Sequence, residues 1–108
     1  MKVFVIKNEQ HSLFEEQIRL LHERFGYYKE YLVPADGWTL AQMQEHIAFL
    51  SQNADTIVFA SPIPYMIKQL SRYNYLRVFV FHNDKREKRV LPDGRVIQTV
   101  ASTGWQLV

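Results

Sequence analysis

Two patterns of hydrophobic and polar positions alternate along the chain, short apolar runs and longer stretches with helical spacing. The runs at 3–6, 56–60 and 76–81 contain at most one polar residue each, which is typical of strands covered on both faces of a parallel sheet. The run at 27–33 mixes tyrosine and valine with charged residues and stops at Pro34. This mixed polarity predicts an edge strand.

Three stretches between these strands have the spacing of amphipathic helices. The first is expected to begin at Ser12, which stands three residues before Glu15 in a capping-box pattern, and to end at Gly26. The second has the same capping pattern from Thr39. The third has Pro64 at its first helical position, where the missing N–H costs nothing.

The pattern changes near the C-terminal end. A charged segment at 85–89 precedes two β-type runs, at 90–91 and 96–101, which are joined by Pro-Asp-Gly at 92–94. Proline followed by glycine in this spacing fits a type I turn with a bulge, so we expect an antiparallel β-hairpin. A short apolar segment at 105–108 follows.

The element order β-α-β-α-β-α-β followed by a hairpin predicts one three-layer α/β domain over 1–108. Its core spans 1–84, and the basic loop and C-terminal hairpin span 85–108. Right-handed crossovers and the apolar character of strands 1, 3 and 4 predict a mainly parallel sheet in the order 2-1-3-4, flavodoxin-like in outline. The hairpin is expected at the edge beside strand 4. A split sheet with the hairpin folded over one face is the alternative.

The composition agrees with an α/β domain and excludes several classes. The chain has 108 residues, of which 47% are hydrophobic, enough for one core and against global disorder. Because there is no cysteine, a disulfide framework, a thiolate nucleophile and a cysteine-ligated zinc are excluded. No run approaches about 18 apolar residues, and the run at 3–6 is too short for a signal peptide. We therefore expect a cytoplasmic protein that does not bind membranes.

The carboxyl ends of strands 1, 3 and 4 are expected to meet at one rim, where open α/β sheets bind ligands. Helix N-termini at Ser12 and Pro64 would direct free N–H groups to this rim, and Lys7 would add a positive charge. We therefore expect a phosphate- or nucleotide-like small molecule to bind there. The ligand-binding residues expected at the rim are Lys7, Asn8, His11, Ser12, Ser61, Tyr65 and Asn83.

The segment 55–65, Asp-Thr-Ile-Val-Phe-Ala-Ser-Pro-Ile-Pro-Tyr, resembles the third-strand loop of flavodoxin-like proteins. The loop at 7–11 lacks the Ser/Thr/Gly-rich cradle with which those proteins hold the phosphate of flavin, so no flavin is expected. The chain also has no G-x-G-x-x-G, P-loop or G-x-S-x-G motif. The cofactor is therefore left unassigned.

His82 and Asp84 are the candidates for catalysis. They stand two residues apart at the end of a strand, where they could pair as a base and its orienting carboxylate or face the same side by chance. His22 and His46 lie on separate helices away from the apolar stripes and are expected to be surface or partly packed side chains. The four histidines include no H-x-x-x-H pair, so no metal site is expected. Whether the protein is an enzyme is left open.

The positive charge of the chain is concentrated in one segment. The net charge is +2, whereas the five residues at 85–89 alone carry +3. This predicts an alternative function, a nucleic-acid or protein interaction module without catalytic activity, in which Tyr73, Tyr75 and Trp105 stack on bases. A charged segment that protects a sheet edge against aggregation is the competing interpretation. The residues expected to contact nucleic acid are Lys85, Arg86, Lys88, Arg89 and Arg95.

Self-association is a further expectation. A free edge strand, or the C-terminal hairpin together with Trp105, Leu107 and Val108, could pair across a homodimer. The chain could also be a subunit whose activity belongs to a partner protein.

Overall fold

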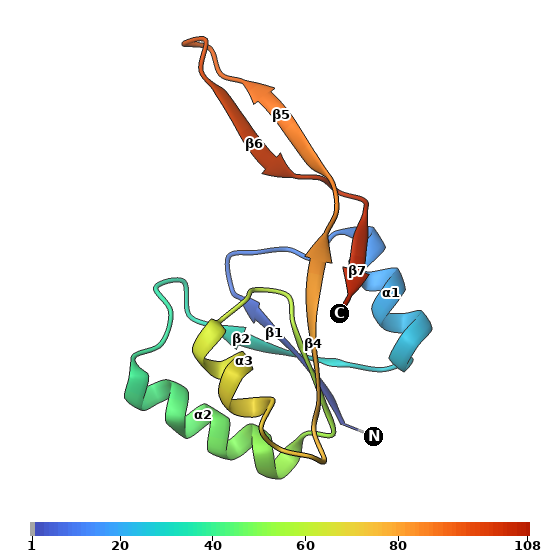
Figure 1. Cartoon of the computed structure of the whole chain (residues 1–108), viewed down its shortest axis with the longest axis vertical. Helices are drawn as coiled ribbons and strands as arrows, with labels where there is room; N and C mark the ends of the chain where they lie inside the picture. Colours follow the sequence, from blue (N-terminus) through green and yellow to red (C-terminus); the bar gives the residue numbers. More distant parts are fainter. Residues whose placement is uncertain (1) are drawn as a thin grey trace.

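The sheet and its helices are built from residues 2–108, the part of the chain that the computed structural model describes. Strands alternate with helices up to β4, and the remainder of the chain is strand and turn (Figure 1). No helix in this range has the length and apolarity needed to cross a membrane. The elements are β1 (Val3–Asn8), α1 (Glu15–Phe25), β2 (Lys29–Val33), α2 (Leu40–Asn53), β3 (Thr56–Phe59), α3 (Pro64–Leu70), β4 (Arg77–Asn83), β5 (Arg86–Val90), β6 (Val96–Val100) and β7 (Trp105–Leu107).

One sheet of five strands, in the order β2-β1-β3-β4-β7, organises the fold. β1 pairs in parallel with β2 and with β3, and β3 pairs in parallel with β4. In this register Val5 lies opposite Val58, and Val58 lies opposite Phe79. The predicted 2-1-3-4 order of the parallel strands is therefore confirmed.

Helices cover both faces of this sheet, which confirms the three-layer α/β architecture (Figure 1). α1 packs on one face through Leu21, which belongs to a buried cluster with Val5 and Val58. α2 and α3 pack on the other face, where Leu50 and Met66 belong to a second buried cluster. Alternate residues of the central strands point into two different cores, and the apolar runs in the sequence are continuous for this reason.

The two predicted helix caps have different outcomes. Thr39 caps α2 as predicted, because its hydroxyl accepts the Gln42 N–H at 3.2 Å. The predicted cap of α1 at Ser12 is wrong, since Phe14 is the N-cap residue. The side-chain oxygen of Gln17 accepts the Phe14 N–H at 2.9 Å. This amide satisfies the helix start without a hydroxyl and leaves Ser12 in the preceding loop.

The C-terminal hairpin does not lie at the sheet edge, contrary to the prediction. β7 takes that edge and pairs antiparallel with β4, with Phe81 opposite Leu107. The rings of Phe81 and Trp105 lie 6.0 Å apart between centroids, so this pairing buries apolar surface that the charged strand β5 cannot supply. β5 and β6 form a separate two-stranded sheet, the hairpin (Figure 1). It projects from the five-stranded sheet and its helices, which we call the body.

The charged segment at 85–89 is mostly strand rather than loop. β5 begins at Arg86, which pairs with Val100 of β6. The predicted Pro-Asp-Gly turn is confirmed, because Gly94 has a φ of 86° and its N–H donates to the Leu91 carbonyl at 2.9 Å. Only glycine adopts this φ without strain. Backbone pairing therefore orders strands whose side chains are nearly all exposed.

The two helical histidines are surface or partly packed side chains, as predicted, since His22 is exposed and His46 is half-buried. His46 stacks on Trp38 with ring centroids 3.9 Å apart, and its Nδ1 lies 2.5 Å from the Tyr31 hydroxyl. Burial raises the pKa of Tyr31 above its ordinary value. His22 lies beside Tyr28 at a centroid distance of 5.4 Å.

Two valines, one buried in the five-stranded sheet and one exposed in the hairpin, test whether the hairpin contributes to the hydrophobic core. Val58 is 0% exposed in β3, whereas Val90 is 72% exposed in β5. We expect Val58→Ala to lower the free energy of unfolding by about 2 kcal/mol, because it removes buried methyl groups and leaves a cavity. Val90→Ala should change it by less than about 0.5 kcal/mol. Urea denaturation followed by circular dichroism measures both. If both variants lost the same free energy of unfolding, the hairpin would contribute to the core, contrary to the structure.

Candidate functional site

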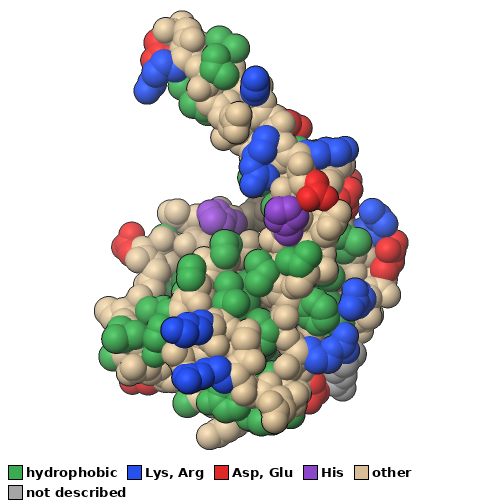
Figure 2. Space-filling view, in the orientation of Figure 1, with side chains coloured by type: hydrophobic (Ala, Val, Ile, Leu, Met, Phe, Trp, Pro, Cys, Tyr) green, Lys and Arg blue, Asp and Glu red, His purple; other side chains and the backbone are tan. Residues whose placement is uncertain are grey.

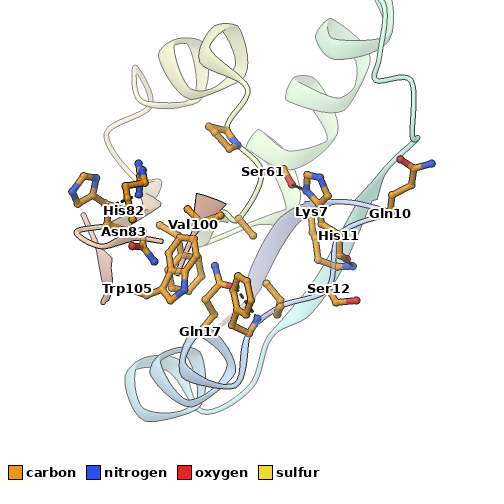
Figure 3. A pocket seen from close by; sticks show the side chains of 16 residues that line it. Lys7, Gln10, His11, Ser12, Gln17, Ser61, His82, Asn83, Val100 and Trp105 are labelled. Atoms are coloured by element: carbon orange, nitrogen blue, oxygen red, sulfur yellow. Dashed lines mark hydrogen bonds between the residues drawn. The ribbon is translucent and has the colours of Figure 1, made fainter. Parts of the chain in front are cut away.

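A pocket of about 580 Å³ lies at the carboxyl ends of β1, β3 and β4, on the side of α1 and beneath the root of the hairpin (Figure 3). This size is in the range of small-molecule sites. The loop after β1, the loop after β3 and the hairpin each contribute to its wall. The lining residues are Lys7, Gln10, His11, Ser12, Leu13, Phe14, Gln17, Ala60, Ser61, Pro62, Phe81, His82, Asn83, Arg86, Val100 and Trp105.

The polar part of the wall is basic. Lys7 and Arg86 line the pocket together with His11 and His82, and no lining residue is an aspartate or glutamate. Figure 2 shows histidine side chains on the borders of the hollow between the body and the projecting hairpin. A wall of this composition attracts negative charge.

Lys7 contributes a buried positive charge at the floor of the pocket. Its residue is only 7% exposed, and its ammonium donates to the His11 carbonyl at 2.5 Å. The nearest carboxylate, that of Glu30, lies 3.9 Å away and is partly exposed. Lys7 therefore fixes the loop after β1 while only partly neutralised by its acidic neighbour.

Ser61 joins the loops that follow β1 and β3. Its hydroxyl oxygen accepts the Asn8 N–H at 3.0 Å and lies 3.0 Å from Nδ1 of His11 (Figure 3). A serine beside a histidine is also the start of a nucleophilic site. However, the N–H groups of Ala60 and Ser61 both donate to the carbonyl of Ile6, so neither can stabilise an oxyanion. The arrangement favours binding over acyl transfer.

Two residues predicted for the ligand site do not line the pocket. Asn8 turns toward the loop after β2, where its side-chain amide donates to the carbonyls of Pro34 and Ala35 at 3.4 and 3.3 Å. Tyr65 packs against the core on the α2 and α3 side of the sheet. Asn8 is the last residue of β1 and Tyr65 follows β3, but both side chains lie on the face of the sheet opposite to the pocket.

Asn83 lies in the pocket wall, but its amide holds the hairpin root. Its side-chain nitrogen donates to the carbonyls of Ala101 and Thr103, both at 3.1 Å. Its side-chain oxygen accepts the Lys85 N–H at 2.7 Å. Since the residue is 5% exposed and its amide is engaged at both ends, Asn83 positions the hairpin and is not free to bind a ligand.

His82 and Asp84 form the predicted pair at the end of β4. Nε2 of His82 lies 2.9 Å from one carboxylate oxygen of Asp84, and the other oxygen accepts a hydrogen bond from Gln106. Both side chains are more than half exposed. His82 lines the pocket and Asp84 does not. The pair has the geometry of an oriented histidine, and a catalytic role for it stays a prediction.

Two pocket residues were missed by the sequence analysis. Gln17 is 4% exposed, its oxygen is bound to the Phe14 N–H, and its amide nitrogen points into the pocket (Figure 3). The indole nitrogen of Trp105 is buried and has no hydrogen-bond partner among residues 2–108. The signal for Gln17 was available, because a polar residue four positions before Leu21 lies on the apolar stripe of α1.

Acidic side chains oppose the positive potential that was predicted at the N-terminus of α1. The first turn of α1 carries Glu15 and Glu16, which offset the helix dipole, and Glu16 accepts the Trp105 N–H at 2.7 Å. α3 begins with Pro64, which has no N–H to offer. The full positive charges of the pocket wall come from the side chains of Lys7 and Arg86.

Replacing Asn83 tests its role at the hairpin root. We expect Asn83→Ala to lower the free energy of unfolding by about 2 kcal/mol, because the buried carbonyl of Ala101 and the part-buried carbonyl of Thr103 lose their donor. Amide hydrogen exchange should accelerate in β5 and β6 more than in β1 or β3, since the root is released first. Asn74→Ala, at an exposed position after α3, is the control and should change neither quantity. Unchanged exchange in the hairpin of Asn83→Ala would show that other contacts hold it.

Neither a metal centre nor a relative identifies the site. Within residues 2–108, no three histidine, aspartate or glutamate side chains are close enough together to hold a metal ion. Comparison of the chain with protein-family models, with curated proteins and with solved structures found no match. The function is therefore argued from the chemistry of the pocket alone.

Proposed function

We propose that the protein binds a small anionic molecule with an aromatic or apolar group, a nucleotide being the model ligand. One observation carries this proposal. The pocket has two cationic side chains and two histidines in its wall, and no carboxylate. A site of this kind favours phosphate or carboxylate groups over cationic ligands.

The apolar part of the wall suits a flat ring. Phe14 and Trp105 stack with centroids 5.8 Å apart at an interplanar angle of 29°. Phe81 meets Trp105 edge-on, with centroids 6.0 Å apart. A nucleobase against these side chains would add an aromatic contact to the apolar area that it buries.

Free hydrogen-bond donors supply polar contacts for such a ligand. The amide nitrogen of Gln17 points into the pocket and can donate to a ring acceptor. Arg86 uses one guanidinium nitrogen for the carbonyls of Asn83 and Lys85, at 3.1 and 3.0 Å. Its other nitrogens remain for a phosphate, which arginine can bind in a bidentate manner.

We propose separately that the protein self-associates through the free edge of β2. β2 is an outer strand of the sheet, and its Leu32 is 52% exposed. Lys29 and Glu30 on the same strand are charges of the kind that limit edge pairing. A homodimer through this edge would leave the pocket open, because β2 contributes no residue to its wall.

Adenosine 5′-monophosphate and adenosine form a matched pair of probes. We expect the monophosphate to bind at least about tenfold more tightly than the nucleoside, a difference of about 1.4 kcal/mol, because only it meets Lys7 and Arg86. The chain has two tryptophans, so Trp38→Phe leaves Trp105 as the sole indole reporter in the pocket. Quenching of its fluorescence measures both affinities. Arg86→Ala should reduce the difference between the two probes.

Lys88→Ala is the control for this titration, because Lys88 is a neighbouring cation that does not line the pocket. It should leave both affinities unchanged. No binding of the monophosphate at millimolar concentration, or equal binding of the two probes, would refute an anionic ligand.

A further inference from the structure

The hairpin has two faces of different chemistry. Residues directly opposite in an antiparallel pair share a face, and successive residues alternate between faces. Arg86 and its partner Val100 line the pocket, so their face is turned toward it at the hairpin root. We call this the inner face. It consists of the cross-strand pairs Arg86–Val100, Lys88–Gln98 and Val90–Val96.

Unopposed positive charge lies on the inner face. It carries Arg86 and Lys88 and no acidic residue. On the outer face Arg89 stands next in line to Glu87, so that face has no net charge. Five basic residues were predicted from the sequence to contact nucleic acid. Only two of them, Arg86 and Lys88, lie on the face that is turned toward the pocket.

The other two basic residues of this segment are engaged elsewhere. Arg95 donates to the Asp93 carboxylate at 2.6 Å at the hairpin tip. Lys85 lies at the root, where its side chain packs on Gly104 and its ammonium is 3.4 Å from the Thr103 hydroxyl.

Within residues 2–108, the inner face of the hairpin is exposed beyond its root. Val90 and Val96 on this face are 72% and 60% exposed. The hairpin extends the molecule to 49 Å along its longest axis, and Figure 2 shows the hollow that separates it from the body. An isolated two-stranded hairpin is of marginal stability in water, so a partner on this face would stabilise it.

We propose that the pocket and the inner face form one continuous site for single-stranded nucleic acid. One base enters the aromatic pocket, and the phosphates that follow it run along Arg86 and Lys88. The proposal rests on the proposed function, since the pocket holds the first nucleotide. A polyanion is favoured over a protein partner because the inner face has cations and no carboxylate.

The pocket also favours a single strand over a duplex. Its aromatic wall can accept only a base that has left its stack, and an unpaired strand supplies one at the lowest energetic cost. Strand β5 has five residues, so the inner face extends over roughly 17 Å at about 3.4 Å per residue. That length matches about five stacked nucleotides at about 3.4 Å each.

Two neighbouring cations on opposite faces provide the test. Binding of a 5′-phosphorylated DNA single strand of about six nucleotides to the whole chain is compared with binding of adenosine 5′-monophosphate. The strand should bind at least about tenfold more tightly than the monophosphate, and Lys88→Ala should remove most of that gain. Arg89→Ala removes an equal charge from the outer face and should have little effect. Fluorescence anisotropy over a range of salt concentrations gives the affinities. The salt slope of Lys88→Ala should fall by about 0.7 for each lost phosphate contact.

Each outcome decides at least one of the two proposals. If the monophosphate binds and the strand binds no more tightly, the continuous site is refuted and the proposed function stands. If neither probe binds at millimolar concentration, both proposals fail. Equal losses in Lys88→Ala and Arg89→Ala would refute the inner face as the contact surface. Tighter binding of a duplex than of the strand would refute the single-strand assignment. The nucleic-acid partner would also be refuted by a dimer that buries Lys88, if light scattering shows that this dimer persists when the DNA is added.

Discussion

The parallel pairing of β1 with β3 is the constraint on which the site depends. Both strands are buried from either side, so the chain must leave them at the same rim of the sheet. It leaves β1 toward α1 on one face and β3 toward α3 on the other, and the two connections therefore diverge (Figure 1). Ligand sites of open α/β sheets lie where such connections separate. Here the Ser61 hydroxyl, bound to the Asn8 N–H and close to the His11 ring, holds the two connections in register.

Asn83 controls the other side of the pocket. Asn83 is the last residue of β4, and β5 of the second sheet begins at Arg86. Its buried amide binds chain on both sides of the hairpin, the Lys85 N–H before it and the carbonyls of Ala101 and Thr103 after it. The root of the hairpin is therefore fixed to β4, although the rest of the hairpin touches no core. This attachment gives Arg86 a defined place above the pocket.

The sequence was sufficient for the sheet order and for the position of the rim, because both follow from uninterrupted apolar runs and right-handed crossovers. Lys7, His11 and Ser61 come together for that reason alone. The sequence did not decide which C-terminal segment pairs with β4, since two β-type segments compete for one edge and the outcome depends on the packing of Trp105. It also did not show that the Gln17 amide would replace the Ser12 hydroxyl at the helix start. A Ser12 cap would accept the Glu15 N–H, whereas the Gln17 oxygen accepts the Phe14 N–H, so local patterns leave two starts open for the same helix.

The basic segment shows why a count of charges along the chain is a poor guide to a binding surface. Five basic residues stand within 85–95, but a strand sends neighbouring side chains to opposite faces, and the turn pairs one of them with Asp93. The face that remains cationic is the one that begins at the pocket, because Arg86 belongs to both. A ligand that reaches Arg86 from the pocket has its next cation at Lys88, two residues farther along the same face. The positive charge therefore extends from the pocket along the inner face of the hairpin, and an extended anion can contact more of it than a compact one.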